Sequence, residues 1–193
     1  NGFVKRALPR TTSNVDACAG DVRDPDFIGR TIAQWRPSCI VHLAAVHHIP
    51  TCEREPTLAM DVNVVGTQVM LDACAAAGVD RFVLASSAAV YDWVEGPLAE
   101  DKTPLRATDV YSVGKLANEG QLRAWASRDD RRKAAIARIF NVIGHDDPNG
   151  HLIPDIVEQL AIVDGQVTNQ IVRLGNLAPM RDYTHADDTA AGL

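Results

Sequence analysis

RFVLASS, residues 81–87, is a short apolar run that ends in two serines, and it predicts a strand buried on both faces. Helical patterns lie on either side of it, at residues 57–78 and 109–126. Two further apolar runs, at 39–45 and 134–144, predict strands beyond those helices. Alternating strands and helices at this spacing predict an α/β fold, a doubly wound parallel sheet with helices on both faces.

The same patterns continue toward both ends of the sequence. They predict helices at 24–37 and 152–165 and a short strand at 170–174. No strand precedes Asn1, and the last residues, 186–193, resemble the start of a helix. We therefore expect that the sequence lacks residues at both ends of the domain.

Composition and charge argue against several classes of protein. The 193 residues are 46% apolar, which is enough for a core, and the formal net charge is −6 without a basic stripe. We therefore predict no nucleic-acid binding and, because no apolar run has transmembrane length, no membrane segment. The four cysteines form no C-x-x-C motif and suit the reducing cytoplasm, with Cys39 and Cys74 expected to be buried. The pair His47–His48 lacks further ligands at suitable spacing, so we predict no metal site.

Tyr111 and Lys115 lie four residues apart in the predicted helix 109–126, so they share one face. A tyrosine with the usual pKa of about 10 is a poor base at neutral pH. A nearby ammonium group favours the phenolate and lowers that pKa. For an isolated pair with this spacing, a surface tyrosine with a solvated lysine is the commoner explanation, so the spacing alone does not establish a catalytic pair.

Ser86 and Ser87 follow the buried strand, where ligands bind in open α/β sheets. A serine at that position can donate a hydrogen bond to a substrate oxygen. Alternatively, both serines cap the next turn.

SSAAVY, residues 86–91, followed by Y-x-x-x-K 24 positions after Ser87, resembles the extended short-chain dehydrogenase/reductase family. Within it, the sequence is most similar to the NAD-dependent epimerase/dehydratase group, and the similarity extends from GDVRD (20–24) to RDYTHADD (181–188). The resemblance implies a Rossmann-like fold and a catalytic set of Ser87, Tyr111 and Lys115. Tyr111 would be the acid/base, and Lys115 would bind the nicotinamide ribose and lower the tyrosine pKa.

The resemblance also implies a nicotinamide cofactor, NAD, with NADP left open because the strand that selects between them is not recognisable. GDVRD would meet the adenine, VHLAAV (41–46) would lie along the cofactor, and RIFNVIG (138–144) would lie near the nicotinamide. NGFVKRAL (1–8) resembles the second half of the glycine-rich phosphate loop, but Lys5 occupies the position of its third glycine. The implied cofactor-binding residues are Gly2, Asp21, Val22, Leu43, Ala44, Ala45, Asn63, Ala85, Tyr111, Lys115, Phe140 and Val142.

Two later segments resemble those of nucleotide-sugar 4-epimerases of the UDP-glucose type. HLIPDIVEQL (151–160) is similar to the segment that meets the diphosphate, and RDYTHADD is similar to a substrate-side element. Dehydratases of the group carry acidic residues where this sequence has Ala88 and Ala89, which cannot transfer protons. The implied substrate-binding residues are Ser87, Asn141, His151, Leu152, Arg181 and Tyr183.

The resemblance therefore implies transient oxidation of a nucleotide sugar to a 4-keto intermediate by bound NAD. Two alternatives remain: a reductase or dehydrogenase with net NAD(P) turnover, and a cofactor-binding protein without catalysis, which the altered glycine loop allows. We expect residues 1–150 to form the NAD(P)-binding domain and 151–193 to begin the substrate-binding region. Helices 57–78 and 109–126 would form a four-helix homodimer interface.

Overall fold

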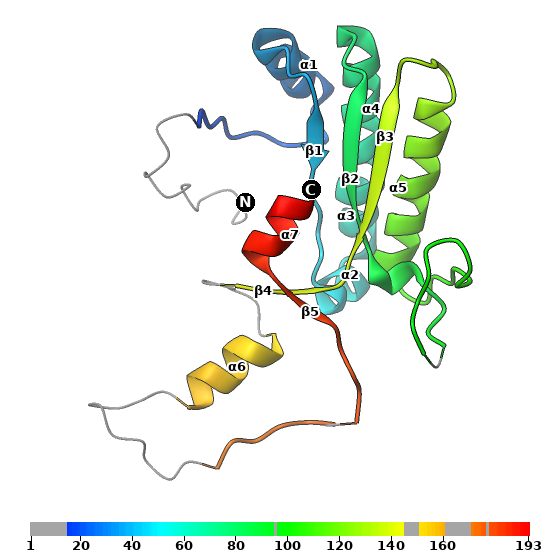
Figure 1. The fold of residues 1–193 in the computed structure, drawn as a ribbon. Coiled ribbons are helices and arrows are strands. Elements are labelled where there is room, and N and C mark those ends of the chain that lie inside the picture. The colour runs from blue at the N-terminus through cyan, green and yellow to red at the C-terminus, as the bar shows by residue number, and fades with distance from the viewer. Residues whose placement is uncertain (1–14, 95, 145–150, 161–170, 177) are drawn as a thin grey trace.

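A three-stranded parallel sheet forms the centre of the molecule (Figure 1). The computed structural model describes residues 15–94, 96–144, 151–160, 171–176 and 178–193. The strands are β1 (Ile40–His42), β2 (Arg81–Ser87) and β3 (Lys133–Ile139), in the order β1-β2-β3. The predicted parallel arrangement of these strands is confirmed.

Helices α1 (Pro25–Trp35), α4 (Gly66–Ala77) and α5 (Val110–Ala126) follow the strand pattern as predicted. Helix α5 packs on β2 and β3, while α1 packs on α4. Asp24 caps α1 by accepting hydrogen bonds from two backbone N–H groups, and Asp109 forms a capping box with Ser112 at the start of α5. The buried core between these elements consists of Ile28, Ile32, Leu71, Cys74, Val79, Phe82, Leu84, Leu122 and Trp125.

The predicted helix 57–78 contains a π turn. It comprises α3 (Pro56–Met60), the π turn η1 (Asp61–Val65) and α4, and it ends at Gly78, whose φ is 72°. Two carbonyl groups of the π turn accept hydrogen bonds from α5: Asn118 donates to Asn63 at 2.8 Å and Gln121 donates to Val64 at 3.0 Å. These long-range side-chain contacts hold the wider turn in place.

Gly66 begins α4 where the chain segment Asp21–Arg23 crosses it. A Cβ atom at Gly66 would lie 2.7 Å from Cγ2 of Val22, which is closer than carbon atoms can approach. Glycine is therefore required here because it lets the segment before α1 approach the helix.

A second, two-stranded parallel sheet lies below the first in Figure 1. It pairs β4 (Asn141–Ile143) with β5 (Tyr183–His185) and leads into α7 (Ala186–Gly192). The predicted strand 134–144 is therefore two strands, β3 and β4, interrupted at Phe140. The proposed boundary at residue 150 separates these paired strands in the sequence, and the two-domain division remains a prediction.

Other elements complete the described part of the chain. They are α2 (Ile49–Arg54), the 3₁₀ turn η2 (Ala88–Val90) and α6 (Leu152–Gln159), which covers the start of the predicted helix 152–165. Residues 161–165 of that prediction lie outside the described residues. The predicted strand 170–174 is wrong for residues 171–174, which are irregular.

Two further observations concern the surface and the cysteines. Cys74 is fully buried as predicted, but Cys39 is exposed because it precedes the first residue of β1. In the described part of the chain, no helix has both the length and the apolar character needed to cross a membrane.

Candidate active site

A cavity of about 1510 Å³ lies at the carboxyl ends of β2 and β3. Its walls come from these strand ends, the start of α5, the segment after β1, α6 and the region of β5. The predicted residues that line it are Leu43, Ala45, Ala85, Ser87, Tyr111, Lys115, Phe140, Asn141, Val142, His151, Leu152, Arg181 and Tyr183. Residues predicted on six separate segments of the sequence thus share one cavity.

The three predicted catalytic residues meet in this cavity. The capping box at Asp109 starts α5 so that Tyr111 lies in its first turn. Lys115 is 4% exposed; its Nζ donates to the carbonyl oxygen of Ala85 at 2.7 Å and lies 5.7 Å from the centre of the Tyr111 ring. Ser87 lines the same cavity as Tyr111 and lowers the pKa of its hydroxyl. Of the two interpretations left open by the spacing, the shared cavity excludes the solvated surface pair.

The pKa of Tyr111 is raised in the structure, whereas the sequence predicts that Lys115 lowers it. Burial raises the pKa of Tyr111 and outweighs the hydrogen bond with Ser87, which lowers it. Burial also lowers the pKa of Lys115 to about 8, so its ammonium group is retained at neutral pH. The expected lowering of the tyrosine pKa by Lys115 is therefore not seen in the chain by itself, because desolvation of the phenolate is the larger effect.

Asn63 does not line the cavity but binds the backbone of a segment that does. It is 2% exposed. Its Oδ1 accepts from the backbone N–H of Val46 at 2.8 Å, and its Nδ2 donates to the carbonyl oxygen of Val46 at 3.0 Å. This two-way contact fixes the segment that carries Leu43 and Ala45. Ala44, in the same segment, is exposed and is not part of the lining.

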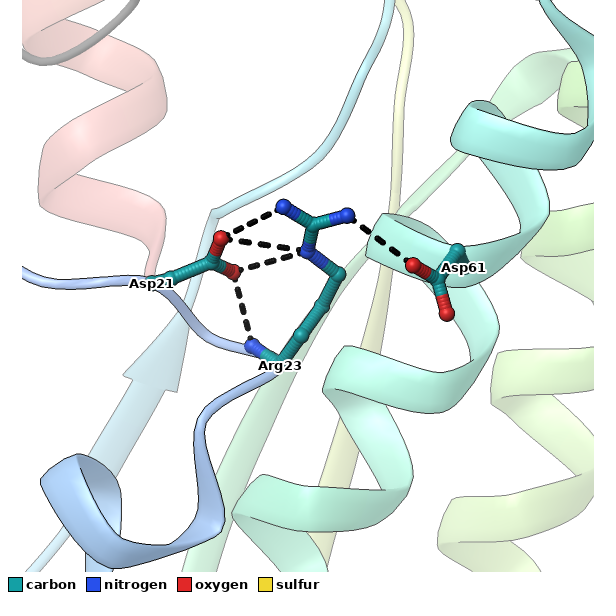
Figure 2. A network of polar contacts seen from close by, with 3 residues as sticks. All are labelled: Asp21, Arg23 and Asp61. Carbon is teal, nitrogen blue, oxygen red and sulfur yellow. Dashed lines mark hydrogen bonds and ion pairs between the residues drawn. The ribbon is translucent and has the colours of Figure 1, made fainter. Parts of the chain in front are cut away.

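Asp21 takes part in an exposed ionic network with Arg23 and Asp61 (Figure 2). Arg23 Nη2 lies 2.6 Å from the Asp21 carboxylate, and its Nη1 lies 2.9 Å from that of Asp61 in the π turn. The hydrogen bonds from Arg23 lower the pKa of Asp21 to about 2. Asp21 and Val22 do not line the cavity, and Gly2 lies outside the described residues. The structural role of Arg23 was not predicted.

Sequence reasoning also missed a buried polar network directly behind the serines. Ser86 Oγ donates to Glu119 Oε1 at 2.7 Å, and Arg138 binds both oxygens of Glu119 at 2.9 Å. The Ser86 hydroxyl is therefore committed to Glu119, and Ser87 is the serine that lowers the pKa of Tyr111. Glu119 follows Lys115 by four residues, and this spacing was the available signal.

Trp93 is another residue that was not predicted. It is 56% exposed, its ring lies 6.5 Å from that of Phe140 at an angle of 82°, and the guanidinium carbon of Arg181 lies 5.9 Å from it. Both neighbours line the cavity, so Trp93 lies beside its wall. Among the described residues, no group of three or more His, Cys, Asp and Glu could hold a metal ion.

The sequence model of the NAD dependent epimerase/dehydratase family matches residues 3–193. UDP-glucose 4-epimerase of Neisseria meningitidis serogroup C is 31% identical over 207 residues, which cover 96% of this chain and 60% of that protein. The crystal structure of UDP-glucose 4-epimerase from Thermus thermophilus in complex with NAD superposes with a TM-score of 0.76 and 27% identity, over 89% of this chain and 57% of that one.

A third similar structure is RMD from Pseudomonas aeruginosa complexed with NADPH, with a TM-score of 0.81 and 26% identity over 90% of this chain and 58% of that one. The chain belongs to the NAD dependent epimerase/dehydratase family and has its Rossmann-like fold. It spans about 60% of the length of the curated relatives it matches.

Proposed function

We propose that the protein is a nucleotide-sugar 4-epimerase that acts through bound NAD. The observation that carries this proposal is the meeting of Ser87, Tyr111 and Lys115 at a cavity whose other walls include His151 and Arg181. Relatives named UDP-glucose 4-epimerase match nearly the whole chain. A sugar linked to a nucleoside diphosphate is therefore the substrate class that we propose.

The residues of the cavity fit a nicotinamide cofactor. The apolar side chains Leu43, Ala45, Phe140 and Val142 line the region next to Tyr111 and Lys115. Lys115 would hold the ribose hydroxyls with its remaining ammonium hydrogens, since one of them already bonds Ala85. When bound, oxidised NAD accepts a hydride, and its positive ring adds the charge that lowers the pKa of Tyr111. The cofactor phosphates would meet residues of the glycine loop, which lies outside the described residues.

The roles of the protein side chains follow from their positions. Tyr111 Oη would take the proton of the sugar 4-hydroxyl, and Ser87 Oγ would donate a hydrogen bond to that oxygen. Arg181 and His151, across the cavity, would bind the diphosphate, and Tyr183 and Asn141 would complete the substrate contacts. Return of the proton from Tyr111 to the oxygen, together with return of the hydride to the opposite face of C4, would leave the enzyme and its cofactor unchanged. Ala88 and Ala89 provide no acid or base for elimination, which disfavours a dehydratase.

Net reduction or oxidation with NADP is the second candidate. It is favoured by the similarity to the NADPH complex from Pseudomonas aeruginosa. An epimerase regenerates its cofactor in every cycle, whereas a reductase consumes it stoichiometrically. Cofactor balance therefore separates the two candidates, and absence of any turnover would favour a non-catalytic cofactor-binding protein.

We also propose that the protein forms a homodimer through α3, η1 and α5. The apolar side chains Met60, Val64, Val65, Val110 and Val113 line one surface groove between these elements. Val65 and Val113 are 48% and 45% exposed, which is unfavourable unless a partner covers them. The four unpaired cysteines fit a cytoplasmic location, which remains a prediction.

The proposed function is tested by incubating the protein with NAD and UDP-, dTDP- and GDP-sugars and observing inversion at C4 by NMR. Tyr111→Phe should lower turnover by at least about a hundredfold, because it removes the acid/base. Ser127→Ala is the control: it removes an exposed hydroxyl near the other end of α5, outside the cavity lining, and should retain activity. Full turnover by Tyr111→Phe would refute the proposal.

A further inference from the structure

Tyr111, Lys115 and Glu119 form a stripe on α5, each one helical turn from the next. Two of the three side chains bond consecutive residues of β2: Lys115 donates to the carbonyl of Ala85 at 2.7 Å, and Glu119 accepts from Ser86 at 2.7 Å. Tyr111 and the next residue, Ser87, line the same cavity. The stripe therefore fixes α5 to β2 at the point where β2 reaches the cavity.

Glu119 is the central acceptor of this arrangement. It is 0% exposed, and Arg138 binds both of its oxygens, with Nε and Nη2 each at 2.9 Å. Arg123 Nη2 adds a third charged contact at 2.8 Å. Burial raises the pKa of Glu119, but the hydrogen bonds from Arg138, Ser86 and Arg123 together lower it by more, so the carboxylate stays ionised.

The register of β2 and β3 determines which side chains of the sheet reach Glu119. Ser86 of β2 lies opposite Arg138 of β3, and both side chains reach Glu119 on the same face of the sheet. Neighbouring residues of a strand point to opposite faces. Holding Ser86 against Glu119 therefore sets the direction of the neighbouring Ser87 side chain, which lines the cavity together with Tyr111.

We propose that Glu119 is a positioning residue for the reaction: its carboxylate, held by Arg138, fixes Ser86 and thereby sets the contact between Ser87 and Tyr111. The inference rests on the proposed function. A carboxylate that served only to hold α5 on the sheet would stabilise the fold without affecting that contact. The two roles make different predictions when Glu119 is moved but its charge is retained.

Glu119→Asp makes that change, because it shortens the side chain by one methylene and keeps the charge opposite Arg138. We expect kcat to fall by about tenfold to a hundredfold, since displacements of about 1 Å in an active site have effects of this size. KM should stay within about twofold, because no substrate contact is removed. Arg123→Gln is the matched control; it removes only the partner that is 56% exposed and should leave kcat and KM unchanged.

A double-mutant cycle separates positioning from a purely structural effect. In a Ser87→Ala background, Glu119→Asp should have little further effect on kcat, because the residue through which it acts is already gone. If instead the two losses multiply independently, the proposal is overturned. Should Glu119→Asp fail to fold, Ser86→Ala takes its place in the same cycle, since it removes only the hydroxyl that bonds Glu119.

A readout that does not depend on turnover keeps this test separate from the proposed function. The chain has three tyrosines, so the ultraviolet difference between the protein and its Tyr111→Phe variant reports the pKa of Tyr111. Loss of the Ser87 contact in Glu119→Asp or Ser86→Ala should raise that pKa, because this hydrogen bond lowers it. An unchanged pKa would overturn the positioning role even in a fully active enzyme. Absence of C4 inversion by the wild-type protein would overturn only the proposed function.

Discussion

Two ionic networks of this molecule have almost the same chemistry but opposite environments. In the buried network Glu119 binds Arg138 at 2.9 Å, with side chains 0% and 10% exposed. In the exposed network Arg23 binds Asp21 at 2.6 Å and Asp61 at 2.9 Å, with side chains 36%, 46% and 45% exposed (Figure 2). The shortest exposed contact, at 2.6 Å, is shorter than the buried contacts between Glu119 and Arg138, so distance alone does not rank the networks.

The difference between the networks is what happens when one partner is lost. Water and ions can replace an exposed partner, and such pairs contribute little to stability. Removing Glu119 would instead leave the Arg138 guanidinium in a nearly dry site. The buried network therefore fixes the position of α5 on β2 and β3. The exposed network has only a small effect on the position of the segment before α1.

The largest expected effect comes from breaking the buried network. Glu119→Ala should lower the free energy of unfolding by about 3–5 kcal/mol, because it leaves a buried cation without its partner. The measurement is urea unfolding at pH 7. The double variant Glu119→Ala/Arg138→Met should recover much of the loss, since it removes both charges. A loss below about 1 kcal/mol would mean that burial does not separate the two networks.

Lowering the pH should remove the contribution of ionised Glu119 to the free energy of unfolding. The pKa of Glu119 is lowered in the folded protein, so its contribution is present above the unfolded value of about 4.3 and is lost as the pH falls through the folded value. The difference in stability between wild type and Glu119→Gln should therefore shrink below about pH 4. Unfolding measured from pH 7 to pH 2 checks this. A difference that stays constant in acid would contradict an ionised Glu119.

The smallest expected effect concerns the exposed network. Arg23→Gln should change the thermal midpoint by no more than about 2 °C in low salt and not at all in 1 M NaCl, where the screening length is about 3 Å. Its effect should appear instead in the dissociation constant for NAD. That constant should rise by about threefold to tenfold if Asp21 contacts the adenine as the family resemblance implies, because Asp21 would lose the Arg23 side chain that holds it. Calorimetry with and without salt measures the thermal midpoint and the dissociation constant. A large loss of stability would mean that the exposed network stabilises the fold as strongly as the buried one.

The sequence predicted those parts of the molecule that local pattern determines. β2 and α5 agree with the prediction almost residue for residue, because an apolar run and an N-cap aspartate act over short distances. Helix spacing and a strand end marked Tyr111, Lys115 and the two serines as candidates, and the family resemblance then selected Ser87 and implied the catalytic set.

The missed features all depend on contacts between distant segments. The π turn is held by Asn118 and Gln121 of another helix, and the buried carboxylate of Glu119 is bound by Arg138 on β3. The pKa of Tyr111 could not be read from its neighbour Lys115, because burial decided its direction. The predicted strand at 170–174 relied on an apolar run alone, without a partner strand to confirm it.

The π turn also has a consequence for how the molecule opens. Its carbonyl groups at Asn63 and Val64 are occupied by side chains of α5, so α4 cannot unwind from that end while α5 stays docked. In hydrogen–deuterium exchange, the slowest amides of the two helices should therefore share one opening free energy. Helices α4 and α5 thus behave as one cooperative unit.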